Sequence, residues 1–296
     1  MLLSLPDFDA VSTDTVEEAC SLLHRYGEEA KVLAGGTDLL VKMKHRRVVP
    51  RCLINIKRIP DLDGIRHRNG EGLRIGALAT IQSIKDSPIV SKKFSLLNQA
   101  AGKVGTLHIR HLGTLGGNLA NASPSAEFAP VLLVGGATVT CVGLRGERVI
   151  PIGEFFVGPG RTAMRDDEVL TAVHIPDVRV DEAGIYLKHS LRRMDVAVAA
   201  AAVVLRLEGD VCREARIALG AVGPVPFRAR KAEAALEEQR LSGGPRDSEL
   251  FEEAARVASE ESLPIDDFRA FATFRRHVIG MLVRQGLDRA MSLLRA

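Results

Sequence analysis

Two stretches of the sequence place adjacent glycines ahead of an apolar segment that is typical of a helix. The first is KVLAGGTDLLVKMK, from Lys31 to Lys44, and the second is TLGGNLANASPSAEFAPVLL, from Thr114 to Leu133. Because glycine has no Cβ, backbone N–H groups at such turns can approach a ligand closely, and several of them can point at one anion. Two such turns on one ligand would suit a pyrophosphate.

The same glycine pairs have a simpler interpretation, which is a tight turn between packed elements. Neither stretch is a Walker A loop, since no Gly-Lys-Ser/Thr follows, and neither has the GxGxxG spacing of dinucleotide-binding folds. The usual nucleotide-binding folds are therefore disfavoured. From spacing alone, both the anion-binding and the tight-turn interpretations stay open.

Residues of the types that bind metals or act in catalysis are scattered along the chain. The cysteines, Cys20, Cys52, Cys141 and Cys212, have no C-x-x-C spacing, so we expect buried small side chains rather than ligands of zinc or of an iron–sulfur cluster. The eight histidines form no metal-ligand motif, and we expect no metal site. No Ser-His-Asp, Cys-His or paired-carboxylate pattern is recognisable, so we assign no catalytic side chain.

The composition limits the class of protein. With 296 residues, 46% hydrophobic and 26% charged, the chain can form two or three domains. Its longest apolar run, residues 196–205, is about half of the roughly 20 residues that a membrane span needs. The first residues lack a signal-peptide pattern, so a cytoplasmic protein without a membrane span is predicted. A net charge of +3, no Trp and only two Tyr disfavour nucleic-acid binding.

Helix and strand signals divide the chain into three units. Asp14 and Glu17 form a capping signal for a helix over about residues 15–26, which Gly27 ends. Short apolar runs around the first glycine pair indicate strands, and Pro176 closes a second unit of strands and helices. The expected domains are 1–57, 58–177 and 178–296.

The last helix of the third unit carries a stripe of apolar residues. The spacing of this stripe is that of a core-facing side rather than of a cofactor site. Its members are Phe271, Phe274, Val278, Met281 and Leu282.

Four sequence blocks together resemble one known family. They are LAGGTDLLVKMK, HLGTLGGNLANASPSAEFAPVLL, DEVLTAVHIP and YLKHSLRRMDVAVAAAAV. In this order, and over nearly the whole chain, they resemble the FAD-binding subunit of the molybdenum hydroxylases, the xanthine dehydrogenase and carbon monoxide dehydrogenase family. The resemblance implies an α+β fold in which two N-terminal domains hold FAD between them and a C-terminal α/β domain packs against that pair.

The resemblance also implies which residues bind FAD. At the first glycine turn, backbone near the FAD pyrophosphate would come from Val32, Leu33, Ala34, Gly35, Gly36, Thr37, Asp38 and Leu39. At the second turn it would come from Thr114, Leu115, Gly116, Gly117 and Asn118. Further contacts would be Glu127 to an FAD hydroxyl, where the family more often has aspartate, Leu170 to the flavin and Lys188 beside it. A Cβ at Gly116 or Gly117 should then block FAD while leaving the chain folded.

Simpler roles for several of these residues stay open. Asp38 could cap the helix that follows it, Glu127 could be a helix-start acid, and Lys188 could be an exposed strand lysine. Arg192, Arg193 and Asp195 are expected to form a local ion pair or a subunit contact.

In the family, such a chain is an oxidoreductase subunit. A molybdopterin-binding large subunit transforms the substrate, a small subunit carries two [2Fe–2S] clusters, and FAD in the medium subunit exchanges electrons with an external acceptor, which could be NAD, a quinone or ferredoxin. Some aromatic thioester reductases of the family insert an extra cysteine-bound cluster, which the scattered cysteines here argue against. The alternative is a non-catalytic assembly subunit that has kept the fold and lost flavin.

Overall fold

The computed structural model describes residues 4–296. Its first unit is a parallel sheet with strand order β1-β3-β2, covered by one longer helix. The elements are β1 (Asp9–Ser12), α1 (Val16–Tyr26), a 3₁₀ turn (Gly27–Glu29), β2 (Ala30–Leu33), α2 (Leu39–Lys44) and β3 (Cys52–Asn55).

The predicted first helix is confirmed, with its cap shifted by one residue. Thr15 is the N-cap, and its Oγ1 accepts a hydrogen bond from the Glu18 amide at 3.1 Å. Glu18 in turn accepts one at 3.1 Å from the amide of Asp14, the residue before the N-cap, so the arrangement resembles a capping box displaced by one residue. Gly27, at φ +53°, ends the helix as expected.

The second unit is an antiparallel sheet of order β4-β5-β10-β6-β7, with short helices between its strands. Its strands are β4 (Ile65–Arg68), β5 (Gly72–Gly76), β6 (Thr138–Gly143), β7 (Gly146–Pro151) and β10 (Val169–Ile175), and a small hairpin is formed by β8 (Phe156–Gly158) and β9 (Arg161–Thr162). Its helices are α3 (Ile81–Asp86), α4 (Pro88–Lys93), α5 (Ser95–Ala101), α6 (Leu107–Leu112), α7 (Leu115–Ala120), α8 (Phe128–Val134) and α9 (Ile152–Phe155).

The third unit is an antiparallel sheet of order β11-β12-β13-β14 with three helices on one face. The elements are β11 (Glu182–His189), β12 (Ala199–Glu208), β13 (Val211–Gly220), β14 (Phe227–Arg228), α10 (Arg230–Ala234), α11 (Pro245–Glu261) and α12 (Ala272–Leu294). We propose the three sheets as the centres of the three expected domains. The mixed helix-and-sheet fold class is confirmed.

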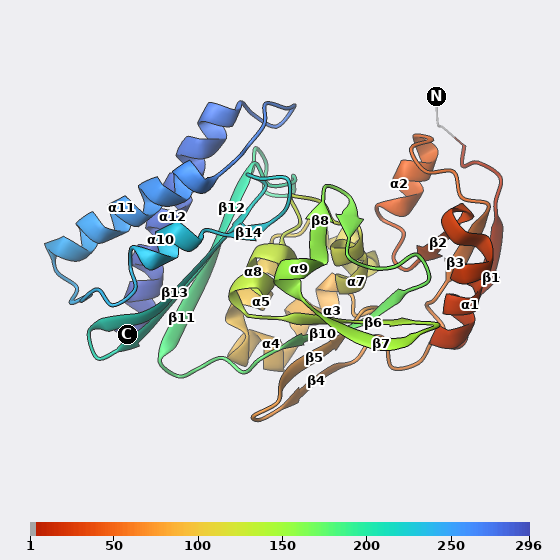
Figure 1. Cartoon of the computed structure of the whole chain (residues 1–296), viewed down its shortest axis with the longest axis horizontal. Coiled ribbons are helices and arrows are strands. Elements are labelled where there is room, and N and C mark those ends of the chain that lie inside the picture. The colour runs from red at the N-terminus through yellow and green to blue at the C-terminus, as the bar shows by residue number, and fades with distance from the viewer. Residues whose placement is uncertain (1–3) are drawn as a thin grey trace.

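The third sheet is buried on both faces, which explains the long apolar run in β12. Ala200 and Val204 pack toward α5 and α8 of the second unit, whereas Ala201 and Val203 pack toward α11 and α12. Figure 1 shows this sheet between the two groups of helices. A strand with two buried faces has no polar alternation, so its sequence is continuously apolar.

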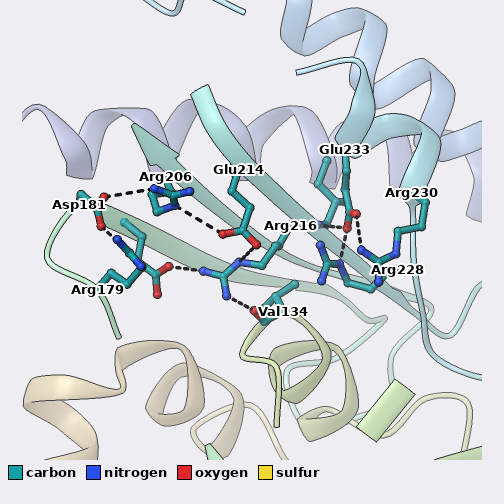
Figure 2. A network of polar contacts seen from close by, with 11 residues as sticks. Val134, Arg179, Asp181, Arg206, Glu214, Arg216, Arg228, Arg230 and Glu233 are labelled. Carbon is teal, nitrogen blue, oxygen red and sulfur yellow. Dashed lines mark hydrogen bonds and ion pairs between the residues drawn. The ribbon is translucent and has the colours of Figure 1, made fainter. Parts of the chain in front are cut away.

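A network of arginines and carboxylates ties the third sheet to the second unit (Figure 2). Arg216 of β13 donates from Nη1 to the carbonyl of Val134, at the end of α8, at 2.7 Å, and it also pairs with Glu182 of β11. Arg206 of β12 lies between Asp181 and Glu214, 3.5 Å from each carboxylate. The end of α8 is therefore held by a side chain of the third unit.

The predicted core-facing stripe of the last helix is only partly correct. Val278 and Leu282 are buried, but Phe271, Phe274 and Met281 are exposed by 72%, 45% and 48%. The sheet covers only the side of α12 that carries Val278, so the rest of the stripe faces outward. Helical spacing shows which residues share a side, but not how wide the covering surface is.

The cysteines are buried, as the sequence predicts. Burial raises the pKa of Cys141 and Cys212 to about 12, so both stay protonated thiols at neutral pH. Among residues 4–296, no helix is both long and apolar enough to cross a membrane.

Candidate functional site

A cavity of about 690 Å³ lies between the first and second units. The first glycine turn and the start of α2 form one wall, and α7 with the start of β10 forms the other. Residues 160–162 of the β8–β9 hairpin close a further side. This volume falls within the range of about 300–1,000 Å³ that is usual for ligand and cofactor sites.

The first glycine turn presents free backbone donors to the cavity. Within residues 4–296, the amides of residues 35–39 have no hydrogen-bond acceptor in the protein. Gly36 has φ +72°, a conformation that favours glycine, and it turns the chain between β2 and α2. A run of unpaired amides around a concave turn favours an anion, and this supports the anion-binding interpretation.

The second glycine turn is built differently. The Leu115 and Gly116 amides donate to the carbonyls of Ala79 and Ala77, at 3.0 and 2.9 Å. The Gly117 amide donates to Oγ1 of Thr114 at 3.0 Å. These amides are therefore already bonded inside the protein, and backbone donation to a pyrophosphate from this turn is not available.

The glycines of the second turn serve packing. A Cβ on Gly116 would lie 2.7 Å from the Cβ of Ala77, and one on Gly117 would lie 2.9 Å from Oγ1 of Thr114. The expectation that a side chain at Gly116 would block only the ligand is wrong, because it would push α7 off β5 and its following turn. The tight-turn interpretation applies here.

Asn118 offers the second polar group of the cavity. Its Oδ1 is buried and has no hydrogen-bond partner in the described part of the chain, and the residue lines the cavity. Nearby, Lys42 of α2 donates to Oδ1 of Asn121 at 2.6 Å, which joins the two walls. A buried side-chain oxygen without a hydrogen-bond partner lowers the stability of the protein alone. A ligand group that donates a hydrogen bond to Asn118 Oδ1 would offset that loss.

Most of the residues assigned from the resemblance line this cavity, and four do not. Those in the lining are Val32, Ala34, Gly35, Gly36, Thr37, Asp38, Leu39, Thr114, Gly116, Gly117, Asn118 and Leu170. The four that are absent from the lining are Leu33, Leu115, Glu127 and Lys188. Their assignment to FAD stays a prediction.

Asp38 stands at the N-cap position of α2, but its side chain makes no capping hydrogen bond. The capping role is therefore not seen, and the carboxylate belongs to the cavity wall. Burial raises the pKa of Asp38, and the nearby Lys42 partly opposes this. A carboxyl group that ionises less readily repels an anion at the turn less strongly.

Glu127 and Lys188 form a buried ion pair with each other. Lys188 Nζ lies 2.8 Å from Glu127 Oε1 and also donates to the carbonyl of Lys103 at 2.9 Å. The Lys188 side chain is only 3% exposed, so the exposed-lysine role is wrong. Glu127 makes no capping hydrogen bond to α8, and burial raises its pKa, while Lys188 opposes that rise.

The sequence did not reveal several residues of the lining. They include the hairpin residues 160–162, residues 164–166 and Glu168, and Ala77, Ile81, Ile109 and Asn121. The letters VGPGRT at the hairpin signal a turn, but nothing in them indicates that the turn folds back over the first glycine turn.

Comparisons with known proteins show the family of the chain. Residues 6–178 match the family model of the FAD binding domain in molybdopterin dehydrogenase, and residues 185–290 match that of the CO dehydrogenase flavoprotein C-terminal domain. The chain belongs to this family of FAD-binding subunits. The predicted family, the FAD cofactor and the oxidoreductase class are thereby confirmed.

Relatives cover nearly the whole chain. The carbon monoxide dehydrogenase medium chain of Hydrogenophaga pseudoflava is 33% identical over 96% of this chain and 97% of its own. The xanthine dehydrogenase FAD-binding subunit of Escherichia coli O157:H7 is 30% identical over 94% of each. A solved carbon monoxide dehydrogenase structure from H. pseudoflava superposes with a TM-score of 0.93 over 98% of this chain and 99% of that one.

Asn118→Leu should separate ligand binding from stability. Leucine removes the unpaired buried Oδ1, so the apo-protein should keep or gain free energy of unfolding, while affinity for FAD should fall by about tenfold or more. Urea unfolding and titration of apo-protein with FAD measure the two effects.

The matched control is Asn98→Leu, because Asn98 donates to the Lys85 carbonyl at 2.6 Å outside the cavity. It should lose stability and keep FAD. Unchanged FAD affinity in Asn118→Leu would remove Asn118 from the site.

Lys188→Met should make stability more dependent on pH. Since the pKa of Glu127 is raised in the folded state, the stability it contributes is present below its ordinary pKa and is lost as pH rises through the raised value. Without Lys188 that pKa rises further, and the variant should lose about 3–5 kcal/mol at alkaline pH. Urea unfolding at about pH 5 and about pH 8 tests this, with the exposed Lys57→Met as control. A Lys188→Met curve parallel to that of the wild type would contradict the ion pair.

Proposed function

We propose that the chain is the electron-transfer subunit of a multi-subunit molybdenum hydroxylase. It would pass electrons between the [2Fe–2S] clusters of a small subunit and an external acceptor, while a molybdopterin-binding large subunit transforms the substrate. NAD, a quinone and ferredoxin remain candidate acceptors. The observation that carries the proposal is one cavity that joins the free amides of residues 35–39 to the unpaired Oδ1 of Asn118.

The residues of the cavity fit a dinucleotide cofactor. The amides of residues 35–39 would hold the pyrophosphate, with Lys42 nearby as a positive charge. Leu170 and Ile81 supply apolar walls that would exclude water from a flat ring system. When bound, FAD supplies the reversible electron chemistry, and the chain supplies binding, orientation and shielding from water.

No side chain of this chain needs to act as a nucleophile or a general acid for this function. The relatives are named as medium chains or FAD-binding subunits. These names agree with a complex in which different subunits carry the flavin and transform the substrate. The residues that determine substrate specificity would then lie in another subunit.

The purified chain alone should carry FAD and lack substrate chemistry. We expect a yellow protein that releases about one FAD per chain on heating, has at most weak diaphorase activity, and does not hydroxylate purines, aldehydes or nitrogen heterocycles. Visible absorption and activity assays measure this. A colourless chain that cannot be loaded with FAD would favour the assembly-subunit alternative, and substrate hydroxylation by this chain alone would contradict the subunit assignment.

A further inference from the structure

The helix α6 contributes to the cavity and yet has little apolar packing to hold it. Its residue Ile109 lines the cavity, and the carbonyl oxygen of Leu112 is the atom that the first glycine turn approaches at Gly35. In the described part of the chain, none of the six residues of α6 is buried. A helix of this length is not stable by itself in water. Contacts other than hydrophobic burial must therefore hold α6 in place.

One arginine of α6 makes three side-chain hydrogen bonds that anchor the helix. Arg110 donates from Nε to Oε1 of Gln82, in α3, at 2.9 Å. Its Nη1 donates to the carbonyls of Val104 and Gly105 at 3.2 and 3.3 Å. The guanidinium can reach all these acceptors at the same time because its donors are fixed in a planar fork. Arg110 thus ties α6 both to α3 and to the loop in front of α6.

The side chain that Arg110 holds in α3 is itself fixed. Gln82 is 8% exposed, and its Nε2 donates to both carboxylate oxygens of Asp86, at 2.9 and 2.8 Å. These bonds orient the amide of Gln82 with its oxygen toward Arg110. Since Ile81 and Ile84 hold α3 in the apolar core, the bonds attach α6 to a fixed element.

The loop in front of α6 is held from two sides. Lys188 of β11 donates to the carbonyl of Lys103 at 2.9 Å. Arg110 binds the next two carbonyls, those of Val104 and Gly105, so two cationic side chains bind three consecutive carbonyls. Val104 is 7% exposed and lines the cavity, and Gly105 turns the chain at φ +39°. Loss of Arg110 would therefore loosen this loop and α6 together.

Both glycine turns depend on where α6 lies. The first turn touches the carbonyl of Leu112. Directly after α6, the carbonyl of Gly113 accepts a hydrogen bond at 2.9 Å from the Ile81 amide, and the next residue, Thr114, is the N-cap of α7. Among residues 4–296, Arg110 is not part of the cavity lining. Its effect on a ligand would therefore be exerted through the elements that it holds.

We propose that Arg110 is a positioning residue for FAD. The inference rests on the proposed function, in which FAD occupies this cavity. By fixing α6 and residues 103–105, Arg110 keeps Val104 and Ile109 in the cavity wall and keeps the carbonyl of Leu112 against the first glycine turn. Without Arg110, this part of the wall would be mobile, and FAD would bind more weakly because binding would have to order it.

Arg110→Met and Arg110→Lys together test the proposal in titrations of the apo-protein with FAD. Arg110→Met should weaken binding by about tenfold or more, the size expected when hydrogen bonds of a charged group are lost. Lysine keeps the charge but cannot reach Gln82 and both carbonyls at once, so Arg110→Lys should weaken binding to a similar degree. The visible absorption of bound FAD is a second readout, because a flavin ring that is more open to water loses the resolved shoulder of its main band.

Arg228→Met is the matched control. Arg228 is a mostly buried arginine that pairs with Glu233 in the third unit, outside the cavity. The variant should lose free energy of unfolding in urea, because it leaves a buried carboxylate without its partner. It should keep the FAD affinity and the absorption spectrum of the wild type.

Hydrogen exchange reports on α6 without FAD. The amides of Arg110 and Gly113 donate to the carbonyls of Thr106 and Ile109. Arg110→Met and Arg110→Lys should speed exchange at residues 110 and 113 of the apo-protein, and Arg228→Met should not. If Arg110→Met does not fold, Gln82→Leu carries the test. It removes only the acceptor of Nε and should weaken FAD binding by about threefold or more.

The outcomes separate this role from the proposed function. Wild-type FAD affinity and spectrum in Arg110→Met, or in Gln82→Leu where that variant carries the test, would overturn the positioning role and leave the proposed function intact. Full FAD affinity in Arg110→Lys would also overturn it, because charge alone would then suffice. Weaker FAD binding with unchanged exchange in α6 would do the same, since Arg110 would then act on FAD directly. A wild-type chain that cannot be loaded with FAD would contradict the proposed function, and with it any role of Arg110 toward FAD.

Discussion

The close approach of backbone at two glycines determines how the cavity between the first and second units is assembled. A Cβ at Gly35 would lie 2.0 Å from the carbonyl oxygen of Leu112, and one at Gly116 would lie 2.8 Å from that of Ala77. Only glycine allows the first turn to reach α6 and α7 to reach the segment after β5. With both contacts made, the amides of residues 35–39 have no hydrogen-bond partner among residues 4–296, and residues 35–39 line one cavity.

The third unit supports this arrangement through α8. At its start, Glu127 is paired with Lys188 of β11. At its end, the carbonyl of Val134 accepts a hydrogen bond from Arg216 of β13, as Figure 2 shows. Both ends of α8 are therefore fixed by one sheet.

Local features of the fold were predictable from the sequence, and long-range contacts were not. The helix over residues 16–26 and the position of both glycine turns follow from neighbouring residues. By contrast, the Glu127–Lys188 pair joins residues 61 positions apart, and the packing of Gly116 on Ala77 depends on how α7 meets the second sheet. The exposure of Phe271 was also missed, because an apolar stripe can face a partner as well as the core.

Amide hydrogen exchange with single-residue resolution, measured on apo-protein with and without FAD, tests the central claim most directly. The account predicts that FAD slows exchange most at residues 35–39, whose amides are free, and changes little at residues 115–118, whose amides are already bonded. Slowing at residues 115–118 with none at 35–39, or slowing confined to residues outside the cavity, would contradict the placement of FAD between these two turns.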